Sequence, residues 1–212
     1  GVCGVTGNGQ DELLRGIVGL LPSRGQLLLA GQPVESFSVK ARANVGLAYV
    51  SPDRRREGLA ITSSVSDNAI GGHTGALSTF GWLRRRSVRA FVGQLIERFA
   101  VKAGRSTAPA SSLSGGNQQK LVVGRELMQQ PRVLVASQPT RGVDLNGVNA
   151  IRSFLVDARN SGAAVLLSSE DLDELLELSD RIIVMYSGTI VAEAKPPYDV
   201  EAIGRSMLGT TS

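Results

Sequence analysis

The chain has 212 residues, of which 42% are hydrophobic and 20% are charged, as expected of one globular domain with a sizeable core. Aromatic residues make up only 4% while glycine occurs 25 times, which favours a turn-rich α/β domain over a β-sandwich. The net charge of +4 includes short basic clusters at 54–56 and 84–86. Because no aromatic stacking platform is recognised beside them, a nucleic-acid partner is not expected.

The first half of the chain alternates between strand-like and helical patterns. Gly1 lies inside the first strand-like segment, so the chain is expected to be part of a longer polypeptide. The expected elements are a strand at 1–6, a helix at 11–20, strands at 26–30 and 45–50, a polar loop at 51–64 and a helix at 87–101. Segment 65–110 is expected to be mainly helical, with a glycine-rich interruption at 71–81 that contains the only histidine, His73, as a surface loop residue.

The second half of the chain predicts a parallel sheet. Helices are expected at 117–129, 145–160 and 171–178, and strands at 133–136, 164–167, 181–185 and 189–192, the last two joined as a hairpin at 187–188. Repeated helix–strand alternation with apolar strands implies a mostly parallel sheet with helices on both faces. Residues 1–212 are thus expected to form one domain, with a helical subdomain at about 65–115 inserted into it.

Neither a disulfide nor a membrane span is expected. The single cysteine, Cys3, excludes an internal disulfide and fits a reducing compartment. No apolar run approaches the roughly 20 residues that cross a bilayer, and no signal peptide pattern is present.

A glycine-rich segment between the first strand and the first helix is a candidate phosphate loop. Its candidate nucleotide-binding residues are Gly4, Gly7, Asn8, Gly9, Gln10 and Asp11. Converging backbone N–H groups and a helix N-terminus favour an anion there. The full phosphate-loop pattern has lysine where this chain has Gln10, and serine or threonine where it has Asp11. On its own, the segment also fits a tight strand–helix turn with Asp11 in the first turn of the helix.

A second segment carries the stronger signal. It comprises Leu113, Ser114, Gly115, Gly116, Asn117 and Gln118, followed by Gln119 and Lys120. Its hydroxyl, its glycine N–H groups and the following helix can all face an anion, although an ordinary serine and glycine cap would look similar. This stretch resembles the signature sequence of ATP-binding-cassette (ABC) ATPases.

That resemblance extends along the chain and includes departures at the catalytic positions. Residues 133–144 are similar to the Walker B strand and the D-loop, which contains Asp144. Active members have Asp and Glu at the positions of Ser137 and Gln138, and a histidine at that of Glu170. A glutamine of active members is replaced by Pro52. The resemblance therefore implies a P-loop NTPase fold whose own catalytic residues are not intact, and no metal site is expected here.

The most similar form is the C-terminal half of the tandem ATPase of simple-sugar and nucleoside importers. The matching segments are 7–10, Asp53-Arg54, 113–120, 138–142, Asp144, 169–174 and 179–181. Relatives usually read Pro-Glu-Asp-Arg where this chain has 51–54. An antiparallel subdomain upstream of Gly1 would complete the fold.

The resemblance also implies partners and a location. ATP would be held, with Mg²⁺, at the site of a partner cassette, which is either the N-terminal cassette of the same chain or a second ATPase subunit. Membrane permease subunits and, indirectly, a substrate-binding protein would complete a complex at the cytoplasmic face of the plasma membrane. Two rival interpretations are a self-sufficient ATPase with unusual residues and a soluble cassette that does not serve transport.

Overall fold

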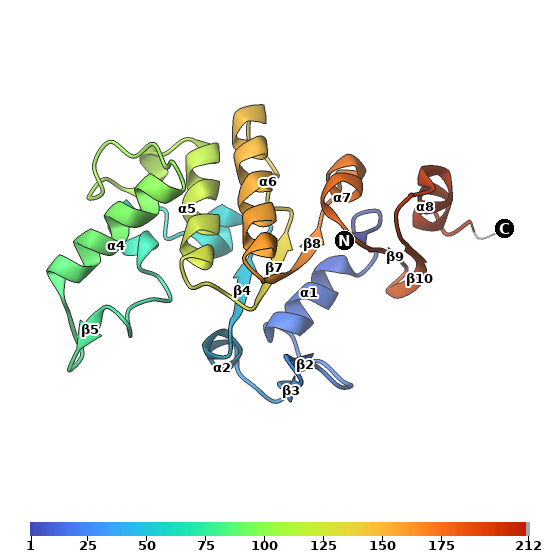
Figure 1. Cartoon of the computed structure of the whole chain (residues 1–212), viewed down its shortest axis with the longest axis horizontal. Helices are drawn as coiled ribbons and strands as arrows, with labels where there is room; N and C mark the ends of the chain where they lie inside the picture. Colours follow the sequence, from blue (N-terminus) through green and yellow to red (C-terminus); the bar gives the residue numbers. More distant parts are fainter. Residues whose placement is uncertain (211–212) are drawn as a thin grey trace. The chain divides into compact units, whose positions relative to one another are not determined.

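The computed structural model describes residues 1–210. These residues form two compact units. The first unit consists of Gly1–Tyr49, Arg132–Gln138 and the described residues from Gly162 onward. The second consists of Val50–Pro131 and Pro139–Ser161. Figure 1 gives the elements of both units in chain order.

The first unit is built on a six-stranded sheet with the order β10-β9-β1-β8-β7-β4. The strands are β1 (Val2–Cys3), β4 (Leu47–Val50), β7 (Val133–Ser137), β8 (Ala164–Ser168), β9 (Ile182–Tyr186) and β10 (Thr189–Ala194). The pairs β1–β8, β1–β9 and β7–β8 are parallel, whereas β10 lies antiparallel to β9 at the edge. The prediction of a mostly parallel sheet, with a hairpin at its end, is confirmed.

Apolar side chains from the six-stranded sheet, from α1 (Gln10–Val18) and from segment 29–34 form the main core of this unit. The fully or almost fully buried members are Val2, Leu14, Val18, Leu29, Val34, Leu47, Val135 and Met185. Leu14 and Val18 lie one helical turn apart on α1, so one face of the helix is buried. This packing fixes the start of α1, and with it the loop that joins β1 to α1.

Several short elements of the first unit were not predicted. Helices α2 (Val39–Asn44) and α8 (Val200–Met207) were missed, and the expected strand at 26–30 is the two-residue strand β2 (Leu28–Leu29) paired with β3 (Gln32–Pro33). Helix α7 (Leu172–Leu178) lies as expected. Both missed helices begin with a side-chain cap, from Ser38 and Asp199, which is a local signal too weak to be separated from the turns around it.

The second unit contains four α-helices, of which the last three are the longest in the described part of the chain. They are α3 (Val65–Ala69), α4 (Arg85–Arg98), α5 (Gly115–Leu127) and α6 (Leu145–Asn160), with a 3-10 turn at Ala110–Ser112. The expectation that 51–64 is all loop is wrong, because the Asp53 carboxylate caps a π-helical turn at Arg54–Gly58. The expectation that 65–110 is mainly helical is also wrong. Its glycine-rich part forms a hairpin of β5 (Ser78–Thr79) and β6 (Trp82–Leu83), since Gly81 permits the left-handed turn.

His73 is buried rather than exposed on a loop, which corrects the sequence-based expectation. Its side chain is 9% exposed, its ring lies 4.7 Å from that of Phe91, and its Nε2 lies 2.9 Å from the carbonyl oxygen of Arg125. A buried imidazole is tolerated because its polar atom has a partner.

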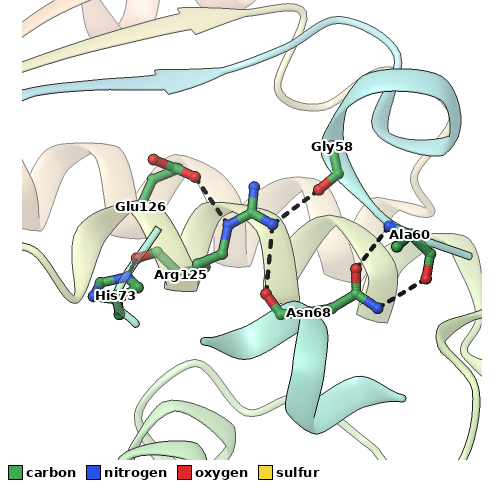
Figure 2. Close-up of polar contacts among 6 residues, drawn as sticks. All are labelled: Gly58, Ala60, Asn68, His73, Arg125 and Glu126. Atoms are coloured by element: carbon green, nitrogen blue, oxygen red, sulfur yellow. Dashed lines mark hydrogen bonds and ion pairs between the residues drawn. The ribbon is translucent and has the colours of Figure 1, made fainter. Parts of the chain in front are cut away.

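Figure 2 shows the polar network around Arg125. The Arg125 Nη1 donates to the carbonyl oxygens of Gly58 and Asn68, at 2.9 and 3.4 Å, and its Nε pairs with Glu126. The buried Asn68 side chain accepts from the N–H of Ala60 and donates to its carbonyl. These contacts tie the π-helical turn, α3 and α5 together.

Candidate functional site

The carboxyl ends of β1, β7 and β8 meet at one edge of the sheet. Val2 of β1 and Ser137 of β7 both align with Ser168 of β8. Because parallel strands end at the same edge, three segments that follow them converge there: the loop 4–9, Gln138, and the pair Ser169-Glu170. In α/β sheets ligands bind at this edge. The candidate nucleotide-binding residues are therefore neighbours of Ser137, Gln138 and Glu170 within the first unit.

The loop at 4–9 is held by its own backbone and by the β9–β10 turn. The N–H of Asn8 donates to the carbonyl of Val5 at 3.1 Å. The side-chain oxygen of Asn8 accepts a hydrogen bond from the N–H of Ser187 at 2.9 Å. The backbone carbonyl oxygen of Asn8 accepts one from the N–H of Gly188 at 3.0 Å. Gly7 and Gly9 have φ of 88° and 101°, a region that favours glycine. Gly9 is the N-cap residue, directly before α1.

Gln10 folds over this loop. Its Nε2 donates to the carbonyl of Val5 at 3.2 Å, and a Cβ on Gly4 would overlap the same amide. Asp11, in the first turn of α1, pairs with Arg15 one turn later, with 2.6 Å between Oδ2 and Nε. The other Asp11 oxygen, Oδ1, is buried without a hydrogen bond. Gln10 and Asp11 thus bring an amide and a carboxylate to positions where a phosphate loop uses a lysine and a hydroxyl.

The segments after β7 and β8 are bonded to each other and to the loop. Gln138 has a φ of 49°, its N–H donates to the carbonyl of Ser168 at 2.8 Å, and its Oε1 accepts from the N–H of Glu170 at 3.1 Å. The Thr6 hydroxyl donates to the Glu170 carboxylate at 2.8 Å. Ser137 is buried at the end of β7. Sequence reasoning missed Thr6, because a loop threonine gives no signal of a partner 164 positions away.

The net charge of this edge is unfavourable for phosphate. The chain has no lysine or arginine before Arg15, whose guanidinium is paired with Asp11. The Asp11 carboxylate lies in the first turn of α1, and the Glu170 carboxylate lies against the loop at 4–9. No group of three or more metal-ligating side chains occurs among residues 1–210. The side chains at this edge therefore do not fit a Mg²⁺-nucleotide in the usual way, in which a lysine binds the phosphates and a carboxylate binds the Mg²⁺.

The second candidate segment lies in the other unit, at the start of α5. Ser114 caps this helix, since its Oγ accepts from the Asn117 N–H at 3.4 Å and from the Asn117 side chain at 2.8 Å. Asn117 in turn accepts from the N–H of Lys102 at 2.7 Å. The buried Gln118 donates to the carbonyl of Ala110 at 3.1 Å, and Leu113 is 8% exposed. The start of α5 is thus rigidly positioned, with Ser114 at its tip.

Two glycines bring the beginnings of α5 and α6 together. A Cβ on Gly116 would lie 3.5 Å from Val143 and 3.7 Å from an Asp144 oxygen, and Gly147 lies against Gly116. Asp144 caps α6 by accepting from the Gly147 N–H at 2.8 Å. Two helix N-termini, each carrying partial positive charge, therefore lie side by side within the second unit.

Arg54 clamps the segment that precedes α6. Its Nη1 and Nη2 donate to the carbonyls of Arg141 and Gly142, at 2.8 and 3.2 Å. Nη2 also lies 2.8 Å from the position of a Cβ on Gly115. Burial lowers the pKa of the Arg54 guanidinium, which arginine tolerates without losing its charge. The Asp53-Arg54 pair was noted in the sequence, but nothing there indicated this contact.

Comparisons with known proteins define the class. A family profile described as ABC transporter matches residues 1–141. A solved nucleotide-free ATP-binding cassette from an ABC transporter superposes with a TM-score of 0.78 at 21% identity, covering 98% of this chain and 83% of that one. A dimeric post-hydrolysis cassette bound to ADP and Pi gives 0.77 at 20% identity, covering 92% and 83%. The fold is that of a P-loop NTPase of the cassette type.

The chain belongs to the ABC transporter family. It is 41% identical over 221 residues to a glucose import ATP-binding protein, TsgD13, of Haloferax volcanii, covering 99% of this chain and 39% of that protein. It is 34% identical over 215 residues to a guanosine import ATP-binding protein, NupO, of Bacillus subtilis, covering 100% and 42%. The chain therefore spans about two fifths of the length of these curated relatives.

Among the described residues, no helix has both the length and the apolar character needed to cross a bilayer.

Proposed function

We propose that this chain is a nucleotide-binding cassette of an importer for simple sugars or nucleosides, and that its own hydrolytic site is degenerate. Two relatives are named for glucose and guanosine import, which supports the substrate class. In this proposal, transport would be driven by ATP hydrolysis at a site completed together with a partner cassette.

The observation that carries the proposal is the chemistry at the edge of the sheet. A working site needs a cation for the phosphates, a carboxylate for Mg²⁺ and a base for the attacking water. At the corresponding places this chain has Gln10, Ser137 and Gln138, and Glu170 adds negative charge. The Gln138 amide cannot accept a proton at neutral pH, and its Oε1 already accepts from the Glu170 N–H. We expect no hydrolysis at this site.

The intact part of the machinery is the signature segment Leu113–Gln118. Ser114 and the N–H groups of Gly115 and Gly116 sit at the start of α5, beside the start of α6. We propose that they face the γ-phosphate of ATP held by the phosphate loop of the partner. That partner is the N-terminal cassette of the same polypeptide or a second ATPase subunit, and it would hold the Mg²⁺.

The remaining partners follow from the family. In the proposal, the loop 51–64 and the segment 65–110 contact permease subunits at the cytoplasmic face of the plasma membrane. A substrate-binding protein would act on the outer side of the permease, without contacting this chain.

ATP turnover of the reconstituted transporter tests the proposal. Replacing Ser114 by Arg, or Gly115 by Asp, places bulk or negative charge where donors must converge, and should lower turnover by about 10²–10³-fold. Gln138→Ala should change turnover by no more than about twofold, because no working base is lost. Gln138→Glu should not create a second active site, since Gln10, Asp11 and Ser137 remain.

One outcome would overturn the central claim. If Gln138→Ala is as damaging as Ser114→Arg, while both variants fold as shown by circular dichroism, the site of this chain is hydrolytic. Steady release of phosphate by the chain alone, with ordinary Mg²⁺ dependence, would contradict the proposal in the same way.

A further inference from the structure

The hairpin Ser78–Leu83, here called the aromatic hairpin, holds the two most exposed aromatic side chains among the described residues. Ser78 pairs with Leu83 and Thr79 with Trp82, which leaves Phe80 and Gly81 as a two-residue turn. Figure 1 shows this hairpin extending beyond the N-terminal end of α4. Phe80 is 98% exposed, and Trp82 is 81% exposed. These side chains contribute almost nothing to the core of the second unit.

The turn holds Phe80 in an unfavourable backbone conformation. Phe80 and Gly81 have φ of 50° and 82°. A two-residue hairpin turn of type I′ requires positive φ at both central positions, and Asn-Gly or Gly-Gly meets this requirement at little cost. A bulky aromatic residue rarely adopts it. Because Phe80 gains no packing in return, its presence at the tip indicates a contact outside the described chain.

A run of arginines follows the hairpin directly. Arg84, Arg85, Arg86 and Arg89 are all exposed, and no aspartate or glutamate occurs between Asp67 and Glu97. Within residues 1–210, no ion pair involves any of these four arginines. Arg84 anchors the base of the hairpin by donating to the carbonyl of Ala76 at 3.0 Å. The arginine cluster 84–86 therefore follows directly on two exposed aromatic side chains, Phe80 and Trp82.

We propose that the aromatic hairpin and these arginines form a docking surface for anionic lipid headgroups. The exposed aromatic side chains lie at and beside the turn of the hairpin, and the arginines lie at its base. Trp and Phe insert at the boundary between headgroups and acyl chains, where tryptophan is enriched, while arginine forks bind lipid phosphates. This surface lies within the segment that the proposed function assigns to the permease, and it would hold the cassette against the lipid beside that contact. Binding of the chain alone to vesicles does not depend on the proposed function.

A nucleic acid fits the same residues less well. Single strands are bound along a groove, with successive bases stacked on aromatic side chains over several nucleotides. Here the exposed aromatic residues are confined to one hairpin, at its two-residue turn and directly beside it, ahead of the arginines rather than among them. Such an arrangement suits shallow insertion into a surface.

Trp82 allows a direct test because it is the only tryptophan of the chain. Its fluorescence would be followed as the full chain is titrated with phosphatidylcholine vesicles, with and without phosphatidylglycerol. We expect a blue shift, and quenching by brominated acyl chains, only with the anionic vesicles. Raising the salt concentration should weaken the response, because the arginine contribution is screened.

Matched variants separate the hairpin from general surface charge and hydrophobicity. Each basic residue near an anionic surface contributes about fivefold to binding, so the double variant Arg85→Gln, Arg86→Gln should lower vesicle partitioning about 25-fold in flotation. Phe80→Ser should lower it as well. Arg24→Gln and Leu208→Ser remove an exposed arginine and an exposed leucine elsewhere, and should leave partitioning unchanged. Circular dichroism would verify folding.

Four results would overturn the proposal. They are the absence of partitioning into anionic vesicles, equal partitioning into phosphatidylcholine alone, a concentration-dependent blue shift without lipid, and displacement of bound vesicles by a single-stranded RNA at lower concentration. The third result would assign the surface to a second copy of the chain, and the fourth to a nucleic acid.

Discussion

The guanidinium of Arg54 occupies the space into which a side chain on Gly115 would extend. Its Nη2 lies 2.8 Å from the position of a Cβ on Gly115, while the same guanidinium bonds the carbonyls of Arg141 and Gly142. The beginning of α5 and the segment before α6 are thus fixed by one side chain. In the proposed function these are the signature segment and the D-loop, so their mutual position matters for catalysis.

The Arg54–Gly115 contact predicts non-additive stability effects. Arg54→Ala should lower the free energy of unfolding by about 1.5–2 kcal/mol, the lower part of the range for charged hydrogen bonds, because the two carbonyls belong to exposed residues. Gly115→Ala should destabilise the chain when Arg54 is present, and should cost at least about 0.5 kcal/mol less in the Arg54→Ala background. Urea unfolding of the four proteins measures this coupling. Arg55→Ala, at an exposed neighbour, is the control, and strictly additive effects would contradict the contact.

Two helix glycines should respond oppositely to alanine. A Cβ on Gly124 of α5 would lie 2.7 Å from the ring of Phe99, so Gly124→Ala should cost about 1–3 kcal/mol through overpacking. Nothing lies within 4 Å of a Cβ on Gly93 of α4, where Gly93→Ala should stabilise by roughly 0.5–1 kcal/mol through helix propensity. Thermal or urea unfolding measures the change in stability caused by each alanine, and the two changes should have opposite signs. Phe99→Leu should relieve part of the Gly124→Ala cost, and equal effects of the two alanines would refute the assignment.

The sequence was sufficient for the sheet and for the long helices, because their signals are repeated over many residues. The apolar strand 133–136 and the helix 145–160 were placed almost as the structure has them. The aromatic hairpin was missed since each strand is two residues long, too short for an alternating pattern, and its turn uses Phe80 instead of a usual turn residue. His73 was misplaced because its partners, Phe91 and Arg125, lie far along the chain.

The candidate site divides in the same way. Local motifs predicted the candidate phosphate-loop, signature and strand-end positions, since their residues are consecutive. The contacts that join them, such as Thr6 with Glu170 or Arg54 with Gly142, link residues separated by 164 and 88 positions. No pattern in one sequence specifies such pairs, because they depend on how the strands are ordered in space.

Cys3 should be chemically inert in the folded chain. It is 1% exposed within β1, and burial raises the pKa of its thiol from 9.0 to about 11. Because the thiolate is the reactive form, alkylation by iodoacetamide at pH 8 should proceed only as fast as the chain unfolds. The rate would be measured by mass spectrometry in increasing urea. Rapid labelling without urea would show that the thiol is accessible.

The raised pKa of the Cys3 thiol predicts a loss of stability at alkaline pH. Below pH 9 the thiol is protonated in both the folded and the unfolded chain, and its contribution to the free energy of unfolding is fully present. Between pH 9 and 11 the unfolded chain releases the proton while the folded chain retains it, so stability falls as pH rises. Cys3→Ala should remove this part of the decline. Subtracting its urea-unfolding profile from that of the parent chain isolates Cys3 from other groups that titrate in the range.

The Glu170 carboxylate should weaken any nucleotide binding at the edge of the sheet. It accepts the Thr6 hydroxyl at 2.8 Å and so lies directly against the candidate phosphate loop, where its charge would repel phosphate. Glu170→Gln keeps the size of the side chain and removes this charge, and should raise affinity for a fluorescent ADP analogue by about three- to tenfold, with the larger effect at low salt. Glu201→Gln removes a charge on α8 and should have no effect. Fluorescence anisotropy with purified protein provides the affinities.

If Glu170→Gln binds the analogue no better than the parent chain, while Glu201→Gln behaves as expected, the Glu170 carboxylate is not what keeps nucleotide from this loop. The folded-over amide of Gln10, bonded to the Val5 carbonyl at 3.2 Å, would then be the group to replace next.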